Sequence, residues 1–63
     1  MTLQEVTHAL DLAFQDEVSK LLAVLMMKLR SKDDNAQEVF EQGLAHCLRA
    51  HDLAVESARK LFN

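Results

Sequence analysis

Apolar residues recur every three or four positions along two long stretches of the chain, and a short polar segment separates the two. This spacing keeps the apolar positions on one face of an α-helix. The first stretch carries two overlapping stripes that meet in residues 21–27. The more regular stripe of the second stretch consists of Phe40, Leu44, Cys47, Leu48, His51, Ala54, Val55, Ala58, Leu61 and Phe62. The pattern predicts two amphipathic helices.

Capping signals mark where each predicted helix begins. Thr2 and Glu5 have the spacing of a capping box, in which each side chain accepts a hydrogen bond from the backbone N–H of the other residue. Two alternative pairs repeat this spacing before the second helix: Asp34 with Gln37, and Asn35 with Glu38.

Few residues would interrupt these helices. Proline is absent, and Gly43 is the only glycine. A short polar connection is typical of antiparallel helical neighbours. We predict a single all-α domain over residues 1–63, with a helix at about 3–31, a turn at about 32–35 and a helix at about 36–61. The expected fold is an antiparallel helical hairpin.

Residues 21–27 are apolar around the whole circumference of the first helix. A helical segment of this kind is normally buried on every side, which one neighbouring helix cannot achieve. We therefore expect two hairpins to assemble as a homodimeric four-helix bundle. The predicted interface consists of Leu21, Leu22, Leu25, Met26, Phe40, Leu44, Cys47, Leu48, His51, Ala54, Val55 and Ala58.

Length and composition agree with an oligomer. A chain of 63 residues rarely forms a core worth more than roughly 3–5 kcal/mol unless something else staples it. Cys47 is the single cysteine, which excludes an intramolecular disulfide and fits a reducing cytoplasm. The formal net charge of -3 argues against a nucleic-acid surface. Residues 1–6 lack the features of a signal peptide, and we expect no membrane-spanning segment.

Cys47 and His51 are the main candidates for metal binding or catalysis. They lie one helical turn apart, so each chain of a two-fold dimer could supply two zinc ligands. We favour instead a small buried cysteine and a hydrogen-bonded core histidine, because the first helix offers no obvious further ligand. Cys47 also lacks the cationic surroundings that activate a thiol, and one glycine is too few for a phosphate-binding loop. We predict no enzyme activity, no cofactor and no metal.

A further set of residues resembles those of a known family. They are Met1, Thr2, Gln4, Glu5, Thr7, Phe14, Leu21, Leu22, Ala58, Arg59 and Phe62. With them the chain resembles the Rop family of plasmid copy-number regulators, which implies a hairpin that dimerises and binds paired RNA loops. The resemblance places Phe14 on an RNA-contacting face, where Lys20 and Lys28 could contact phosphates. Leu3 and Leu10 stand where that family has basic or polar contact residues.

Three functions are therefore open. The one we favour is a small non-catalytic, homo-oligomeric interaction protein of the adaptor, regulator or co-chaperone type. Its partners would be a second copy of itself and another helical protein. The alternatives are a Rop-like RNA-binding regulator and a metal-linked helical dimer.

Overall fold

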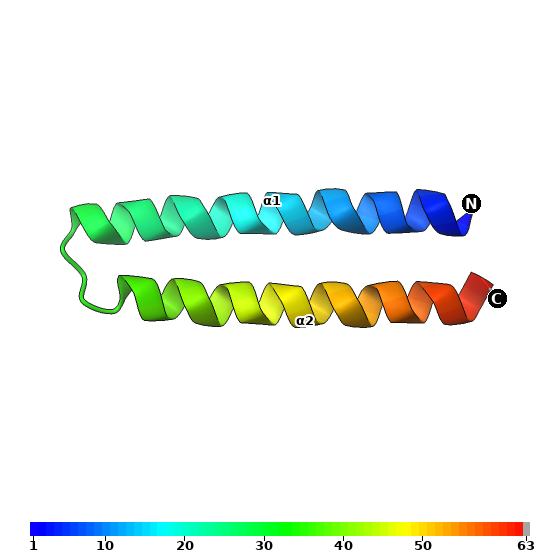
Figure 1. Ribbon diagram of the computed structural model, residues 1–63. Helices are drawn as coiled ribbons and strands as arrows, with labels where there is room; N and C mark the ends of the chain where they lie inside the picture. Colours follow the sequence, from blue (N-terminus) through cyan, green and yellow to red (C-terminus); the bar gives the residue numbers. More distant parts are fainter. Residues whose placement is uncertain (63) are drawn as a thin grey trace.

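A computed structural model describes residues 1–62 as two antiparallel helices, α1 at Leu3–Arg30 and α2 at Ala36–Phe62 (Figure 1). The helices lie side by side and are joined by one short connection. Both ends of the chain lie at the same end of the molecule, opposite the turn (Figure 1). The prediction of an all-α helical hairpin is confirmed.

The start of α1 is held by the predicted capping box. The hydroxyl of Thr2 accepts a hydrogen bond from the backbone N–H of Glu5 at 3.1 Å. Oε1 of Glu5 accepts one from the backbone N–H of Thr2 at 3.3 Å. Two of the N–H groups that a helix start leaves without helical partners are thereby satisfied.

α1 ends in a Schellman motif. Beyond the C-cap Ser31, the backbone N–H of Lys32 donates to the carbonyl of Leu29 at 3.1 Å. The N–H of Asp33 donates to the carbonyl of Lys28 at 3.0 Å. This pair of bonds needs one residue in the left-handed conformation, and Lys32 takes it with a φ of 56°.

The start of α2 differs from both predicted capping boxes. Oδ1 of Asp33 accepts a hydrogen bond from the backbone N–H of Asn35 at 2.9 Å. Lys28 Nζ lies 3.4 Å from the other carboxylate oxygen. These two interactions hold the pKa of Asp33 below its ordinary value, the bond from Asn35 contributing most. The predicted partners interact along α2 instead, since Gln37 donates to Glu41 and Glu38 accepts from Gln42.

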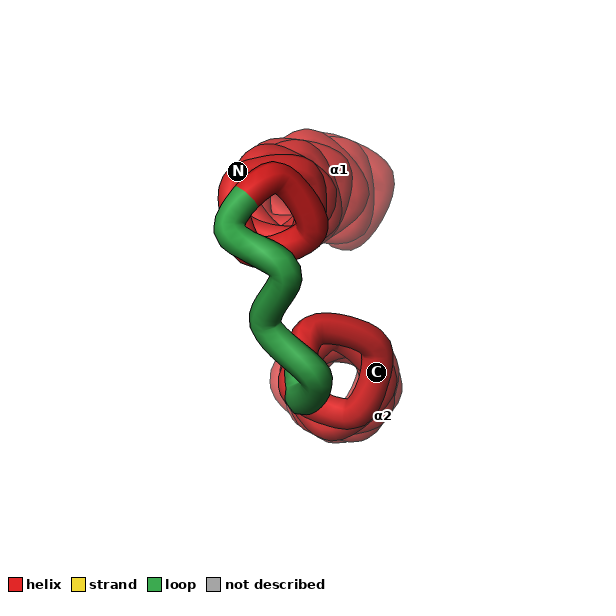
Figure 2. The backbone as a smooth tube through the Cα atoms, turned by 90° about the vertical axis from the view of Figure 1, so that its left-hand side faces the viewer, coloured by secondary structure: helices red, strands yellow, loops and turns green. Residues whose placement is uncertain are grey.

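The molecule is a single layer of two helices. Figure 2, a view along the helices from the turn, shows one beside the other with no further element over either face. The Cα atoms span 48 × 15 × 7 Å, and their radius of gyration is 14.8 Å. A compact domain of this length would have a radius of gyration of about 11 Å. Among residues 1–62 only Ala36 and Ala58 are buried, with 2% and 6% of their surface exposed.

Gly43 allows the helices to approach each other midway along the layer. A Cβ atom at this position would lie 2.6 Å from Cδ2 of Leu21, closer than two carbon atoms can pack. The missing side chain therefore leaves room for the end of Leu21 between the helices.

Candidate interaction surface

Most of the exposed large apolar side chains of residues 1–62 lie in the half of the hairpin nearest the turn. Within residues 21–27, Leu21 and Leu25 are half-buried toward α2. The other large side chains of this run face outward, as predicted for a segment apolar on every side. The exposed apolar residues of the turn half are Leu22, Val24, Met26, Met27, Leu29, Val39 and Leu48.

These residues divide between the two broad faces of the layer. Leu22 follows the inward-facing Leu21 by one position, and Leu48 follows the inward-facing Cys47 by one position. One position turns a helix by about 100°. Because α1 and α2 run antiparallel, the same offset from the inward stripe brings both side chains to the same broad face. We call this surface the leucine face, and it consists of Leu22, Met26, Leu29, Leu44 and Leu48.

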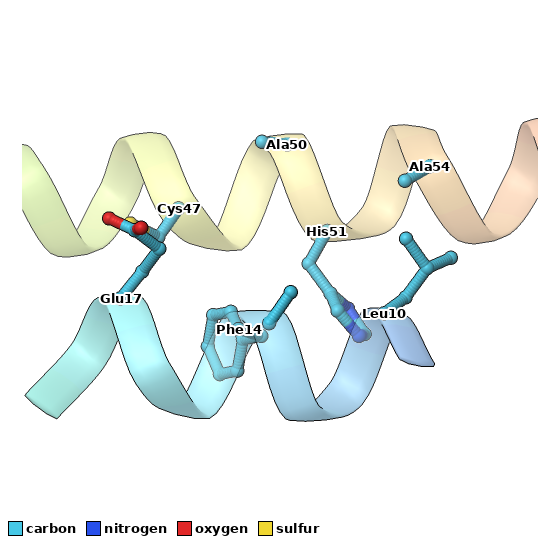
Figure 3. Close-up of a pocket in the computed structure, with 8 residues that line it drawn as sticks. Leu10, Phe14, Glu17, Cys47, Ala50, His51 and Ala54 are labelled. Atoms are coloured by element: carbon cyan, nitrogen blue, oxygen red, sulfur yellow. The ribbon is translucent and has the colours of Figure 1, made fainter. Parts of the chain in front are cut away.

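The opposite face carries a small groove between the two helices (Figure 3). Val24 and Val39 lie on this face, because each precedes an inward-facing residue by one position. The groove, which we call the alanine groove, has a volume of about 220 Å³. Its lining residues are Leu10, Ala13, Phe14, Glu17, Cys47, Ala50, His51 and Ala54. The alanine groove contains no enclosed, polar pocket in which a substrate could be oriented.

Within residues 1–62, His51 makes the only side-chain hydrogen bond between the two helices. Its Nε2 lies 2.8 Å from Oδ1 of Asp11, and its ring centroid lies 5.0 Å from that of Phe14. The side chain of His51 is 25% exposed and that of Asp11 is 57% exposed. The apolar pattern does not predict Asp11 as the partner of His51, because 40 positions separate the two residues.

The structure does not assemble a metal site around the two candidate ligands. Cys47 has a free, half-buried thiol, and His51 is engaged by Asp11. Across residues 1–62, no group of three or more His, Cys, Asp or Glu side chains could hold a metal ion.

The three residues considered for RNA do not form one surface. Phe14 is half-buried between the helices against His51. The ammonium of Lys20 lies 3.1 Å from Asp16, and the hydrogen bonds that it donates to this carboxylate and to that of Glu17 raise the pKa of Lys20. Lys28 lies about 21 Å from Phe14 along the helix and pairs with Asp33.

Most of the predicted interface residues already pack within one chain. Ala58 is buried by the hairpin itself. The half-buried members are Leu21, Leu25, Phe40, Leu44, Cys47, His51, Ala54 and Val55. The exposed members, which another molecule could cover fully, are Leu22, Met26 and Leu48.

A scan of protein-family models finds no match to this chain, and neither the search of curated proteins nor that of solved structures finds a significant one. Neither helix of residues 1–62 has a stretch that is both long and apolar enough to cross a membrane.

Proposed function

We propose that this chain is a non-catalytic interaction protein that acts as a homodimer, in which two leucine faces meet to form a four-helix bundle. The observation that carries the proposal is the exposure of the leucine face in a chain with almost no interior. Leu22, Met26 and Leu48 each have about half of their surface exposed, and Leu29 has 59%. Fully burying a side chain of this size stabilises a structure by roughly 1.5–3 kcal/mol.

The surface area of a single hairpin supports the same proposal. The chain has an accessible surface of 5123 Å² for a mass of 7.1 kDa. A compact folded protein of that mass exposes about 4,100 Å². The excess of about 1,000 Å² is close to the roughly 800 Å² that each partner buries in a standard protein interface.

The surfaces left outside the bundle suit binding rather than catalysis. The outward sides of both helices carry charged residues at intervals, such as Asp16, Lys20, Glu56 and Lys60. These side chains pair along their own helix and surround no pocket. We infer that the dimer presents them to another protein, as an adaptor or regulator would. Because the single thiol requires no oxidising compartment, we place this role in the cytoplasm.

Light scattering during size exclusion, over a dilution series, tests the dimer. We expect the mass of two chains at micromolar concentration. Leu22→Asp should reduce the mass to that of one chain, because it sets a charge in the centre of the interface. Leu12→Asp is the matched control, since Leu12 is similarly exposed (52% against 49%) and lies outside the leucine face.

Circular dichroism of the same samples separates loss of assembly from loss of fold. A wild-type mass of one chain at all concentrations, with the helices intact, would overturn the proposal. So would an equal loss of mass in Leu22→Asp and Leu12→Asp.

A further inference from the structure

We propose that two hairpins exchange their helices at high protein concentration. In the exchanged dimer the connection between α1 and α2 becomes helical, so that each chain forms one continuous helix. α1 of each copy then packs against α2 of the other copy. This exchange goes beyond the homodimer proposed above, because it uses the contacts inside the hairpin and not those of the leucine face.

The strained connection is the first observation behind the exchange. Lys32 is held at a φ of 56°, which is unfavourable for a residue with a Cβ atom. In a continuous helix Lys32 would take the ordinary right-handed conformation. Residues 31–35 contain neither glycine nor proline, so none of them would interrupt that helix. Short connections under strain favour the exchange of an element between copies.

The spacing across the connection is the second observation. Leu25 is half-buried toward α2, and Ala36 is buried against α1. The two residues are eleven positions apart, which is close to three turns of 3.6 residues. A helical connection would therefore bring the inward sides of α1 and α2 at this point to the same side of one continuous helix.

The contacts between the helices are symmetric about the connection. Asp11 and Phe14 both contact His51, and the end of Leu21 lies beside Gly43. The residue numbers of each pair add up to between 62 and 65, so facing residues lie at equal distances from about residue 32. Two continuous antiparallel helices with a two-fold axis near this residue would repeat each of these contacts between chains.

Exchange replaces the interactions of the turn by those of a helix. The pair between Lys28 and Asp33, at 3.4 Å, would be lost, because five positions separate these residues along a helix. Arg30 and Asp34 make no ion pair within residues 1–62 of the hairpin. They are four positions apart, so a continuous helix would place these opposite charges on neighbouring turns.

Protein concentration decides between the two forms. Joining two chains costs freedom of motion that a single hairpin keeps, so the hairpin is favoured in dilute solution. The Lys32 side chains of the two copies would also meet near the two-fold axis, where their like charges oppose exchange. We therefore expect exchanged dimers when chains refold at millimolar concentration and hairpins when they refold at micromolar concentration.

Crosslinking between the helices tests the exchange. Glu17 of α1 and Cys47 of α2 both line the alanine groove (Figure 3). In Glu17→Cys, a short bismaleimide should join the two thiols within one hairpin but between chains in the exchanged dimer. A denaturing gel then shows the mass of one chain or of two. The wild type, with Cys47 as its only thiol, measures links that arise from collisions.

Two variants of the connection, made in the Glu17→Cys protein, test the role of Lys32. Lys32→Gly removes the strain of the hairpin and should require at least about tenfold more protein for the same exchanged fraction. Lys32→Ala keeps the strain, favours a helix and removes the charge near the axis, so it should exchange at lower concentration than its parent.

The length of the particle is an independent measurement. A continuous helix over residues 3–62 is about 90 Å long, whereas the hairpin spans 48 Å. Small-angle scattering of the millimolar samples should therefore show a longest dimension near the larger value.

Two results would overturn the exchange. One is a denatured mass of one chain after crosslinking at both concentrations, and the other is an equal exchanged fraction in Lys32→Gly and Lys32→Ala. Neither result touches the leucine-face homodimer. Its grooves lie on the face away from the partner, so it gives two chains in light scattering and one chain on the gel.

Discussion

Lys32 takes a backbone conformation that side chains rarely adopt. Its φ of 56° closes the Schellman motif at the end of α1. For a residue with a Cβ atom, the left-handed conformation costs roughly 1–2 kcal/mol, whereas glycine adopts it without strain. The only glycine of the chain stands elsewhere, at position 43. The end of α1 is therefore a local weakness that the sequence pattern did not reveal.

Replacing Lys32 by glycine should relieve this strain. We expect Lys32→Gly to raise the free energy of unfolding by about 1 kcal/mol. Ser31→Gly is the control: with a φ of -84°, Ser31 gains nothing from glycine. Chemical denaturation at one fixed protein concentration measures both variants. A rise of equal size for the two would contradict this explanation.

The contact between Asp11 and His51 should couple the two helices. We expect a double-mutant cycle with Asp11→Asn and His51→Gln to give a coupling of about 0.2–1 kcal/mol. The upper end of that range is not expected, since water screens the half-exposed Asp11. Thermal unfolding of the wild type, the two single variants and the double variant measures it, and a coupling of zero would show that the contact adds nothing to stability.

At the scale of elements, the turn depends on one carboxylate that serves both helices. Asp33 accepts from Asn35 at the approach to α2 and pairs with Lys28 from the last turn of α1. Asp33, Asp34 and Asn35 are adjacent residues of the types that favour the start of a helix, and propensity alone ranks them almost equally. The role of Asp33 depends on the left-handed conformation of Lys32 before it, and the apolar periodicity does not predict that conformation.

Asp33 should make the protein more sensitive to acid. Its pKa is lowered in the folded chain, so its stabilising effect is present above the ordinary aspartate pKa of about 3.9 and is lost as the pH falls through the lower folded value. We expect Asp33→Asn to melt at a lower temperature than the wild type at pH 7. The difference should shrink below about pH 4.

Asp34→Asn is the matched control for this experiment. Asp34 is an exposed neighbour that makes no side-chain hydrogen bond within residues 1–62. Its replacement should therefore leave the fall of the melting temperature in acid unchanged. Melting curves from pH 7 to pH 2 measure all three proteins. If the melting temperatures of Asp33→Asn and the wild type fell in parallel as the pH was lowered, Asp33 would not have the assigned role.

At the scale of the whole molecule, the apolar period and the short polar connection were enough to predict two antiparallel helices. They were not enough to separate contacts inside one chain from contacts between chains. Phe40 and Leu25 belong to the same stripes as Leu22 and Leu48, yet the first two face the other helix and the last two face solvent. A rotation of about 100° about the helix axis separates a side chain that faces the other helix from one that faces solvent. The packing of the two helices fixes this rotation, and the local sequence pattern does not.

The position of the chain ends has a practical consequence for joining two copies into one polypeptide. Both ends lie at the end of the molecule opposite the turn (Figure 1). If two hairpins pack in opposite directions along their full length, a linker from the end of one copy to the start of the next must cover about the 48 Å of a hairpin. That requires at least about 14 residues, even for a fully extended chain. A linker of a few glycines would join only copies whose open ends lie together.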